Sequence, residues 1–153
     1  MTAMQRPFVA VVVLVYRSSD NKVLIGQRKG VLGEGAWELP GGSMEYGETF
    51  DTSCQREVKE ETGLDVAGIR LVTAKNIIFE QAHKHFVSLF FAAQCVDADP
   101  VPKLMEPDKS GGWVWTSWSE LRERKYSPLF GILNDLVDEY PQGPWLASSS
   151  GPA

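Results

Sequence analysis

A glycine-rich turn passes directly into a helical pattern in the stretch Gly42-Ser-Met-Glu-Tyr-Gly-Glu48-Thr-Phe-Asp-Thr-Ser-Cys-Gln-Arg56-Glu57-Val-Lys-Glu60-Glu61-Thr-Gly-Leu64. Thr49 can cap the start of a helix, because its hydroxyl can accept a hydrogen bond from a free backbone N–H. Gly63 suits the left-handed residue that often follows the end of a helix. The sequence therefore predicts a helix over Thr49–Thr62.

Acidic side chains lie on the side of this helix that should be buried. The buried side is defined by Phe50, Cys54 and Val58. At about 100° per residue, Glu57 and Glu61 fall within about 20° of Phe50, and Glu60 falls about 80° away. Two carboxylates therefore continue the apolar stripe instead of opposing it.

A solvated acidic face is the usual interpretation of a helix rich in glutamate, and three features argue against it here. The acids point inward, they lie near the C-terminal end where the helix dipole disfavours negative charge, and they repel one another at i,i+3 and i,i+4 spacing. Each effect costs a few tenths to about 1 kcal/mol, and burying unpaired carboxylates costs several more. A hard divalent cation such as Mg²⁺ or Mn²⁺ would relieve all of these costs.

The segments around this helix alternate between strands and turns. The predicted strands are Phe8–Tyr16, Lys22–Arg28, Ile69–Phe79, His85–Cys95 and Trp113–Trp115. We expect a turn at Pro40–Gly42, a long loop over Val96–Gly112 and a last amphipathic helix over Leu129–Tyr140. These strands, together with a central and a C-terminal helix, predict an α/β sandwich in which helices cover a sheet. We expect one domain over residues 1–140 and a flexible tail over 141–153.

The spacing of the central stretch carries a resemblance to a known family. Gly42 is followed by five residues, Glu48, seven residues and then Arg56-Glu-Val-Lys-Glu-Glu-Thr-Gly-Leu64, which resembles the Nudix box at every fixed position. The resemblance implies the Nudix fold, an α/β/α sandwich with a mixed β-sheet. It also implies hydrolysis of a diphosphate linkage that is attached to another group.

The same resemblance implies roles for individual residues. The catalytic and metal-binding acids would be Glu57, Glu60 and Glu61, with the carbonyl of Gly41 as a further ligand of Mg²⁺ or Mn²⁺. Glu48 and Arg56 would brace the loop against the helix, the alternative being a surface ion pair of little energetic value. Glu106 and Asp108 are candidates for an additional acid, or are solvated charges in a loop.

Segments outside the box resemble the MutT-like branch of the family, which includes a human diphosphatase of thiopurine nucleotides and a plant enzyme for oxidised dGTP or geranyl diphosphate. These segments include Gly26-Gln-Arg-Lys-Gly30, Leu39-Pro-Gly-Gly42 and Leu129-Phe130. The substrate-binding residues implied by position are Arg28 for phosphate, Leu39, Gly41, Gly42 and Ser43 for the pocket, and Phe130 for stacking on a base. Ser43 and Gly131 replace the bulky His and Trp of similar proteins, which leaves room for a larger substituent. The branch also implies a homodimer.

Three functions remain open at this point. The first is hydrolysis of a nucleoside triphosphate, such as 8-oxo-dGTP, to a monophosphate and diphosphate. The second is the same chemistry on a prenyl diphosphate such as geranyl diphosphate, or on a dinucleotide such as NADH. The third is a non-catalytic binding module, and the retention of every acid in the box argues against it.

Composition excludes other classes of protein. The chain has 153 residues, 43% of them hydrophobic, and a net charge of −5, which argues against a protein that binds DNA duplexes. The longest apolar run, Phe8–Tyr16, has nine residues, whereas a membrane-spanning helix needs about 20. Cys54 and Cys95 lack the spacing of a metal site and are expected to be reduced thiols. We therefore expect a cytoplasmic protein that does not contact a membrane.

Overall fold

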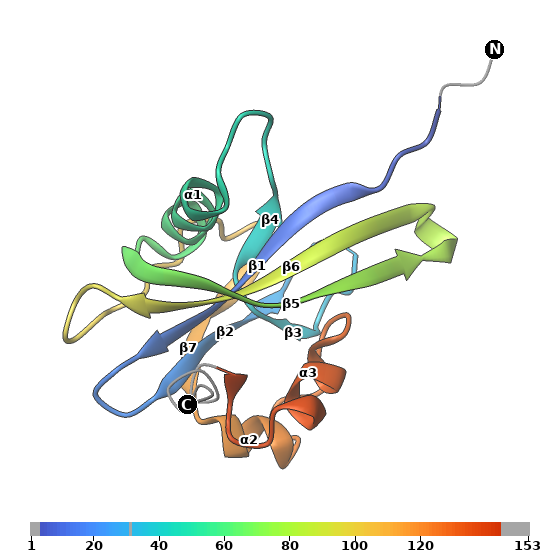
Figure 1. Cartoon of the computed structure of the whole chain (residues 1–153). Coiled ribbons are helices and arrows are strands. Elements are labelled where there is room, and N and C mark those ends of the chain that lie inside the picture. The colour runs from blue at the N-terminus through green and yellow to red at the C-terminus, as the bar shows by residue number, and fades with distance from the viewer. Residues whose placement is uncertain (1–3, 31, 145–153) are drawn as a thin grey trace, which may run out of the picture.

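One mixed sheet of seven strands forms the centre of the computed structural model, which describes residues 4–30 and 32–144 (Figure 1). The strands are β1 (Phe8–Arg17), β2 (Lys22–Arg28), β3 (Trp37–Glu38), β4 (Gly41–Ser43), β5 (Val66–Phe79), β6 (Lys84–Cys95) and β7 (Ser110–Thr116). β1 is central, because it pairs in parallel with β6 and antiparallel with β2 and β4. β5 forms the edge beyond β6, while β3 and β7 both pair with β2.

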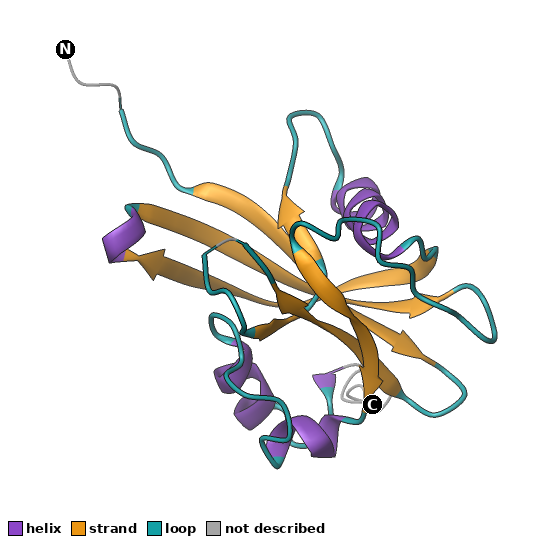
Figure 2. Cartoon of the chain, turned by 180° about the vertical axis from the view of Figure 1, so that it is seen from behind, coloured by secondary structure: helices purple, strands orange, loops and turns teal. Residues whose placement is uncertain are grey.

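Helices cover both faces of this sheet. α1 (Phe50–Thr62) lies on one face, and α2 (Trp118–Arg122) and α3 (Leu133–Glu139) lie on the other, as Figures 1 and 2 show from opposite sides. A short 3-10 helix, η1 (Glu80–Ala82), joins β5 to β6. The prediction of an α/β/α sandwich is therefore confirmed.

The core consists of two apolar clusters, one on each face of the sheet. Val13 of β1 is completely buried in the cluster that includes Val58 of α1. Its neighbour Leu14 is completely buried in the cluster that includes Leu136 of α3. Successive side chains of a strand point to opposite faces, so a strand covered on both sides needs apolar residues throughout. This explains the continuous apolar run of β1.

The ends of α1 form as the sequence predicts. The Thr49 hydroxyl accepts a hydrogen bond from the N–H of Thr52 at 3.2 Å, and the Thr52 hydroxyl accepts one from the N–H of Thr49 at 2.9 Å. Gly63 has φ 74°, in the left-handed region that favours glycine. These caps place the last turn of α1, with its acids, at a defined depth against the sheet.

Three segments near the site differ from the predictions. The expected turn at Pro40–Gly42 contains the start of β4, because Gly41 and Gly42 pair with β1. A side chain at Gly41 is excluded, since its Cβ would lie 2.2 Å from the carbonyl oxygen of Val11. β5 begins at Val66 rather than Ile69, and β7 begins at Ser110, so the expected loop over Val96–Gly112 is shorter.

The last helix is also shorter than predicted. α3 begins at Leu133 rather than Leu129, and Leu129 forms a β-bridge with Trp37 instead. Gly131 has φ 62°, which is incompatible with a continuous right-handed helix. Leu129 shares the apolar spacing of α3 because both pack into the same buried cluster.

Two further predictions concern the extent of the domain and the tail that follows it. The division at residue 140 is untested, and most of the expected tail over 141–153 lies outside the described residues, which end at 144. Within the described part, no helix is long and apolar enough to cross a membrane.

Candidate active site

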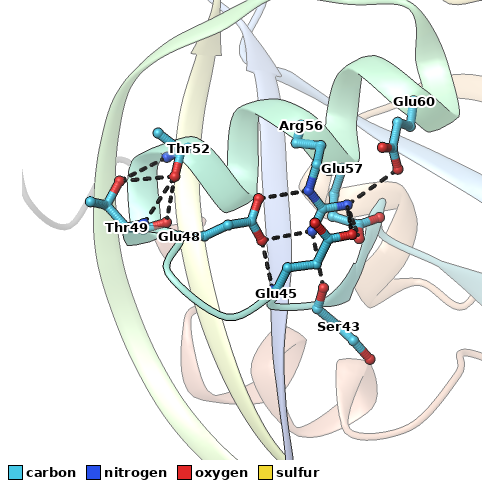
Figure 3. Close-up of polar contacts among 8 residues, drawn as sticks. All are labelled: Ser43, Glu45, Glu48, Thr49, Thr52, Arg56, Glu57 and Glu60. Carbon is cyan, nitrogen blue, oxygen red and sulfur yellow. Dashed lines mark hydrogen bonds and ion pairs between the residues drawn. The ribbon is translucent and has the colours of Figure 1, made fainter.

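Arg56 of α1 is the centre of a polar network that joins the loop after β4 to the helix (Figure 3). Its Nε and Nη2 donate to the two carboxylate oxygens of Glu48 at 2.6 and 2.8 Å. Nη2 also donates to the carbonyl oxygen of Ser43 at 3.1 Å. This forked contact lowers the pKa of Glu48 to about 2. The geometry is that of a brace between loop and helix, as expected for this pair.

The same guanidinium reaches two of the three acids of interest. Arg56 Nη1 donates to Glu57 at 2.8 Å and to Glu60 at 3.2 Å. Glu57 is 8% exposed, and burial raises its pKa despite the nearby cation. The side chain of Glu60 is 54% exposed, so it lies at the rim of the site. The inward direction predicted for Glu57 is confirmed.

Glu61 is partly buried in the last turn of α1. Its carboxylate accepts a hydrogen bond from the N–H of Gly41 at 3.1 Å. Burial, together with the carboxylates of Glu38, Glu57 and Glu106, raises the pKa of Glu61 to about 9. No Lys, Arg or His in residues 4–30 and 32–144 forms an ion pair with it. Glu61 is therefore a partly buried acid near three other carboxylates, with Lys109 as a cation beside the same cavity.

The glycines of the loop lie directly against these acids. A Cβ at Gly42 would lie 2.6 Å from the carboxylate of Glu57. The N–H of Gly41 donates to Glu61, and Gly41 pairs with β1. The backbone of β4 thus lies against both carboxylates, and at Gly42 a side chain would collide with Glu57.

The expected metal cluster is not already assembled. Within the described ranges, no group of three His, Cys, Asp or Glu side chains has the arrangement of a metal site. Glu57 is turned toward Arg56, and Glu61 is turned toward the N–H of Gly41. The donor set nevertheless fits a hard cation, because the carboxylates of Glu38, Glu57 and Glu106 lie near Glu61, which forms no ion pair within the described residues.

A small cavity of about 20 Å³ lies beside Glu61. It is lined by Glu38, Glu61, Glu106, Lys109, Ser110 and Trp113. Its volume suffices for about one water molecule. Glu106 thus reaches the site and pairs with Lys109 at 3.4 Å. Asp108, the other candidate acid, is exposed and does not line the cavity, and only its carbonyl oxygen approaches Gly30.

Four residues at this cavity were not predicted as part of the site: Glu38, Lys109, Ser110 and Trp113. Glu38 precedes Leu39 in a strand of two residues, which is too short to show a periodic pattern. Trp113 was predicted only as part of a strand, yet its indole N–H donates to the carbonyl oxygen of Glu61 at 3.0 Å. Only tertiary pairing brings β3 and β7 to the end of α1.

The residues expected to bind substrate are largely engaged with one another. Arg28 forms an ion pair with Glu38, donates from Nε to the Leu32 carbonyl oxygen at 2.6 Å, and lies 3.8 Å above the centroid of Phe130. Phe130 also stacks on Phe79, with centroids 5.6 Å apart and planes 16° apart. Arg28 and Phe79 thus both lie against the Phe130 ring, and the expected stacking of a base on this ring stays a prediction.

The other expected pocket residues lie at different depths. Leu39 is 5% exposed and belongs to the core on the side of α2 and α3, so it supports the site from beneath. Ser43 is exposed at the end of β4, and its carbonyl oxygen is held by Arg56. Leu39 therefore packs mainly in the core, and its expected contact with substrate stays a prediction.

Comparison with known proteins agrees with this geometry. The model of the NUDIX domain matches residues 6–136. A MutT-like protein of Streptomyces ambofaciens is 31% identical over 117 residues, which cover 76% of this chain and 70% of that protein. The crystal structure of a MutT NUDIX hydrolase from Burkholderia pseudomallei superimposes with a TM-score of 0.76 at 24% identity, covering 88% of this chain and 98% of that chain.

Local matches reach other curated proteins. The 8-oxo-dGDP phosphatase of Homo sapiens is 48% identical over 54 residues, which cover 35% of this chain and 17% of that protein. For several curated relatives, the chain spans less than half of the relative's length.

Proposed function

The chain belongs to the NUDIX family, and we propose that it hydrolyses the diphosphate linkage of a nucleoside triphosphate to a monophosphate and diphosphate. One observation carries this proposal: Glu57 and Glu61 point inward against the strand β4, which contains Gly41 and Gly42. Buried acids that a glycine backbone approaches this closely suit a site for a cation and an anionic substrate. A match to an 8-oxo-dGDP phosphatase supports 8-oxo-dGTP as a substrate to test.

The residues present fit a bound Mg²⁺ or Mn²⁺ ion. Glu57, Glu60, Glu61 and the carbonyl oxygen of Gly41 would hold it. When bound, such an ion neutralises diphosphate oxygens and lowers the pKa of a coordinated water. The carboxylates of Glu60 and Glu61 are the candidates for orienting the attacking water, and Glu106 at the cavity is a third.

A prenyl diphosphate such as geranyl diphosphate is a second candidate substrate. Phe130 stacks on Phe79, Phe79 contacts Phe86, and Phe86 contacts Phe8, with centroid distances of 5.6, 6.2 and 5.8 Å. This row of phenyl rings offers apolar contact but no hydrogen-bonding edge for a base. A dinucleotide such as NADH remains in the same class of alternatives.

A panel of diphosphates tests the proposal. The purified protein with MgCl₂ or MnCl₂ is incubated with 8-oxo-dGTP, dGTP, NADH and geranyl diphosphate, and the products are separated by liquid chromatography. We expect a nucleoside monophosphate and diphosphate from at least one triphosphate. Turnover of geranyl diphosphate alone would favour the second candidate. No turnover of any member with either metal would refute the hydrolase.

We also propose a homodimer, supported by an uncovered apolar face. Leu71 and Ile78 of β5 are 54% and 60% exposed. They pair with Phe91 and His85 of β6, whose odd-numbered residues face the side of α1. Beyond α1, the far ends of β5 and β6 extend away from the described helices that cover the sheet (Figure 1). A cytoplasmic location is a further proposal, supported by the two buried free cysteines.

A further inference from the structure

Glu38 lies where two parts of the site meet. β3 pairs with β2, with Glu38 opposite Gly26, and the Glu38 carboxylate forms an ion pair with Arg28 of β2. The same side chain lines the cavity beside Glu61 and Glu106. Its side chain is 22% exposed. Glu38 thus connects the acids at the end of α1 with the guanidinium that covers Phe130.

Arg28 is held from several directions and keeps a donor. Its Nε binds the carbonyl oxygen of Leu32, its Nη1 binds Glu38, and its guanidinium lies on the ring of Phe130. These contacts leave Nη2 with no partner among residues 4–30 and 32–144. A planar guanidinium fixed in this way can present its remaining N–H groups to an anionic oxygen in a set direction.

The ring beneath Arg28 is itself fixed. The N–H of Phe130 donates to the carbonyl oxygen of Trp37 at 2.8 Å, which places the ring next to β3. A Cβ at Gly33, where φ is 77°, would lie 2.4 Å from the Phe130 ring. The cluster of Arg28, Glu38 and Phe130 is therefore closely packed, and we call it the Arg28 clamp.

The negative charge of Glu38 is electrostatically unfavourable at this cavity, which suggests that the charge is needed to bind Arg28. Glu61 and Glu106 surround the same cavity, so a third carboxylate adds repulsion. A glutamine could accept a hydrogen bond from Arg28 without that repulsion. A charged acceptor binds a guanidinium more strongly, and this matters when a polyanionic substrate competes for it.

We propose that Glu38 is a positioning residue that holds Arg28 against Phe130, so that Nη2 meets an anionic oxygen of the substrate. This inference rests on the proposed function, because it takes a diphosphate as the ligand. Glu38 itself touches neither the substrate nor the attacking water. Its effect is on substrate affinity and passes through Arg28.

Kinetics of Glu38→Gln provide the first test. We expect the variant to raise KM about tenfold or more while kcat changes less than threefold. Glu34→Gln is the matched control, because it removes one negative charge from an exposed position in the preceding loop. A purely structural role for Glu38 would lower the melting temperature and the active fraction but leave KM unchanged. An unchanged KM would overturn the inference.

Arg28→Lys separates the clamp from other effects of Glu38. It keeps the charge but loses the fork, so KM should rise to a similar extent. In the Arg28→Lys background, Glu38→Gln should then change KM less than twofold, because both changes remove the same interaction. Full additivity of the two changes would overturn the inference, and so would an unchanged KM for Arg28→Lys, which decides the question if Glu38→Gln does not fold.

Binding provides a readout that does not need turnover. Guanosine 5′-(α,β-methylene)triphosphate with MgCl₂ is titrated into each protein in a calorimeter, and Kd should rise about tenfold or more for Glu38→Gln but not for Glu34→Gln. If the wild type hydrolyses members of the panel and Glu38→Gln binds the analogue with the same Kd as the wild type, the clamp alone would be overturned. A Glu38-dependent Kd without hydrolysis would support the clamp and refute the hydrolase. Absence of binding to a wild type that also hydrolyses no member of the panel would refute both.

Discussion

The indole N–H of Trp113 donates a hydrogen bond to the carbonyl oxygen of Glu61, 3.0 Å away. Trp113 lies on β7 and Glu61 in the last turn of α1, so the bond joins the sheet to the end of the acidic helix. Carbonyl groups in the last turn of a helix lack partners within the helix. Trp113 therefore satisfies a carbonyl at the residue whose carboxylate accepts the N–H of Gly41.

Trp113→Phe should lower the free energy of unfolding by about 1–2 kcal/mol, because it leaves that carbonyl without a donor. Trp115→Phe is the matched control, since the Trp115 indole N–H is buried without a partner in the described residues. Guanidinium unfolding followed by circular dichroism measures both. A loss for Trp115→Phe as large as that for Trp113→Phe would show that ring volume, and not the hydrogen bond, is responsible.

Glu57→Gln should lower kcat at least tenfold, equivalent to about 1.4 kcal/mol in the barrier, with the fold retained. The amide keeps the shape of the side chain but removes a negative charge from the proposed cation site. Steady-state assays over a range of Mg²⁺ concentrations measure the effect. Asp51→Asn, an exposed acid in the first turn of the same helix, should retain wild-type kcat. More than about a tenth of wild-type kcat in Glu57→Gln would contradict the assignment.

Glu120 should make stability depend on pH in acid. Its carboxylate accepts hydrogen bonds from the N–H of Ser117 and the hydroxyl of Thr116, which lower its pKa to about 2 from an ordinary value of 4.5. Because the folded state favours the ionised form, this stabilisation is present above about pH 5 and is lost as the pH falls toward 2. Urea unfolding across this range should show a difference between wild type and Glu120→Gln that shrinks with falling pH.

Glu123→Gln controls for the loss of one negative charge near the same helix. If the free energies of unfolding of wild type and Glu120→Gln differ by a constant amount from pH 7 to 2, the hydrogen bonds from Ser117 and Thr116 are not the source of the difference.

Both cysteines should resist modification in the folded protein. Cys54 is completely buried, Cys95 is 5% exposed, and burial raises their thiol pKa values to about 12 and about 11. Reaction requires an accessible thiolate. Ellman's reagent at pH 8 should detect almost no thiol until guanidinium unfolds the chain, when two become reactive. Rapid reaction of one thiol under native conditions would show that its part of the core opens.

Ile78→Asp should convert the proposed dimer to a monomer, because it places a charge in the uncovered apolar face. Light scattering coupled to size-exclusion chromatography measures the mass. Val101→Asp, at a loop residue that is 72% exposed, is the matched control and should leave the mass unchanged. A monomeric wild type would refute the dimer, and a dimeric Ile78→Asp would place the interface elsewhere.

Local signals predicted much of the fold. The caps at Thr49 and Gly63 fixed both ends of α1, and short runs of apolar residues identified β1, β2 and β6. These signals depend on hydrogen bonds and side-chain directions within a few residues of each other. The last helix was overextended for the same reason, since Leu129 has helical spacing but pairs with Trp37.

The sequence alone determined that Glu57 and Glu61 turn toward the sheet, because a helix with defined ends fixes the direction of each side chain. Only the tertiary structure decided what meets them there. The N–H of Gly41 binds the Glu61 carboxylate, the indole N–H of Trp113 binds the Glu61 carbonyl oxygen, and the acids Glu38 and Glu106 lie nearby. These partners come from strands and loops far apart in the chain. Their approach depends on strand pairing and on two-sided burial of the sheet, which no local pattern records.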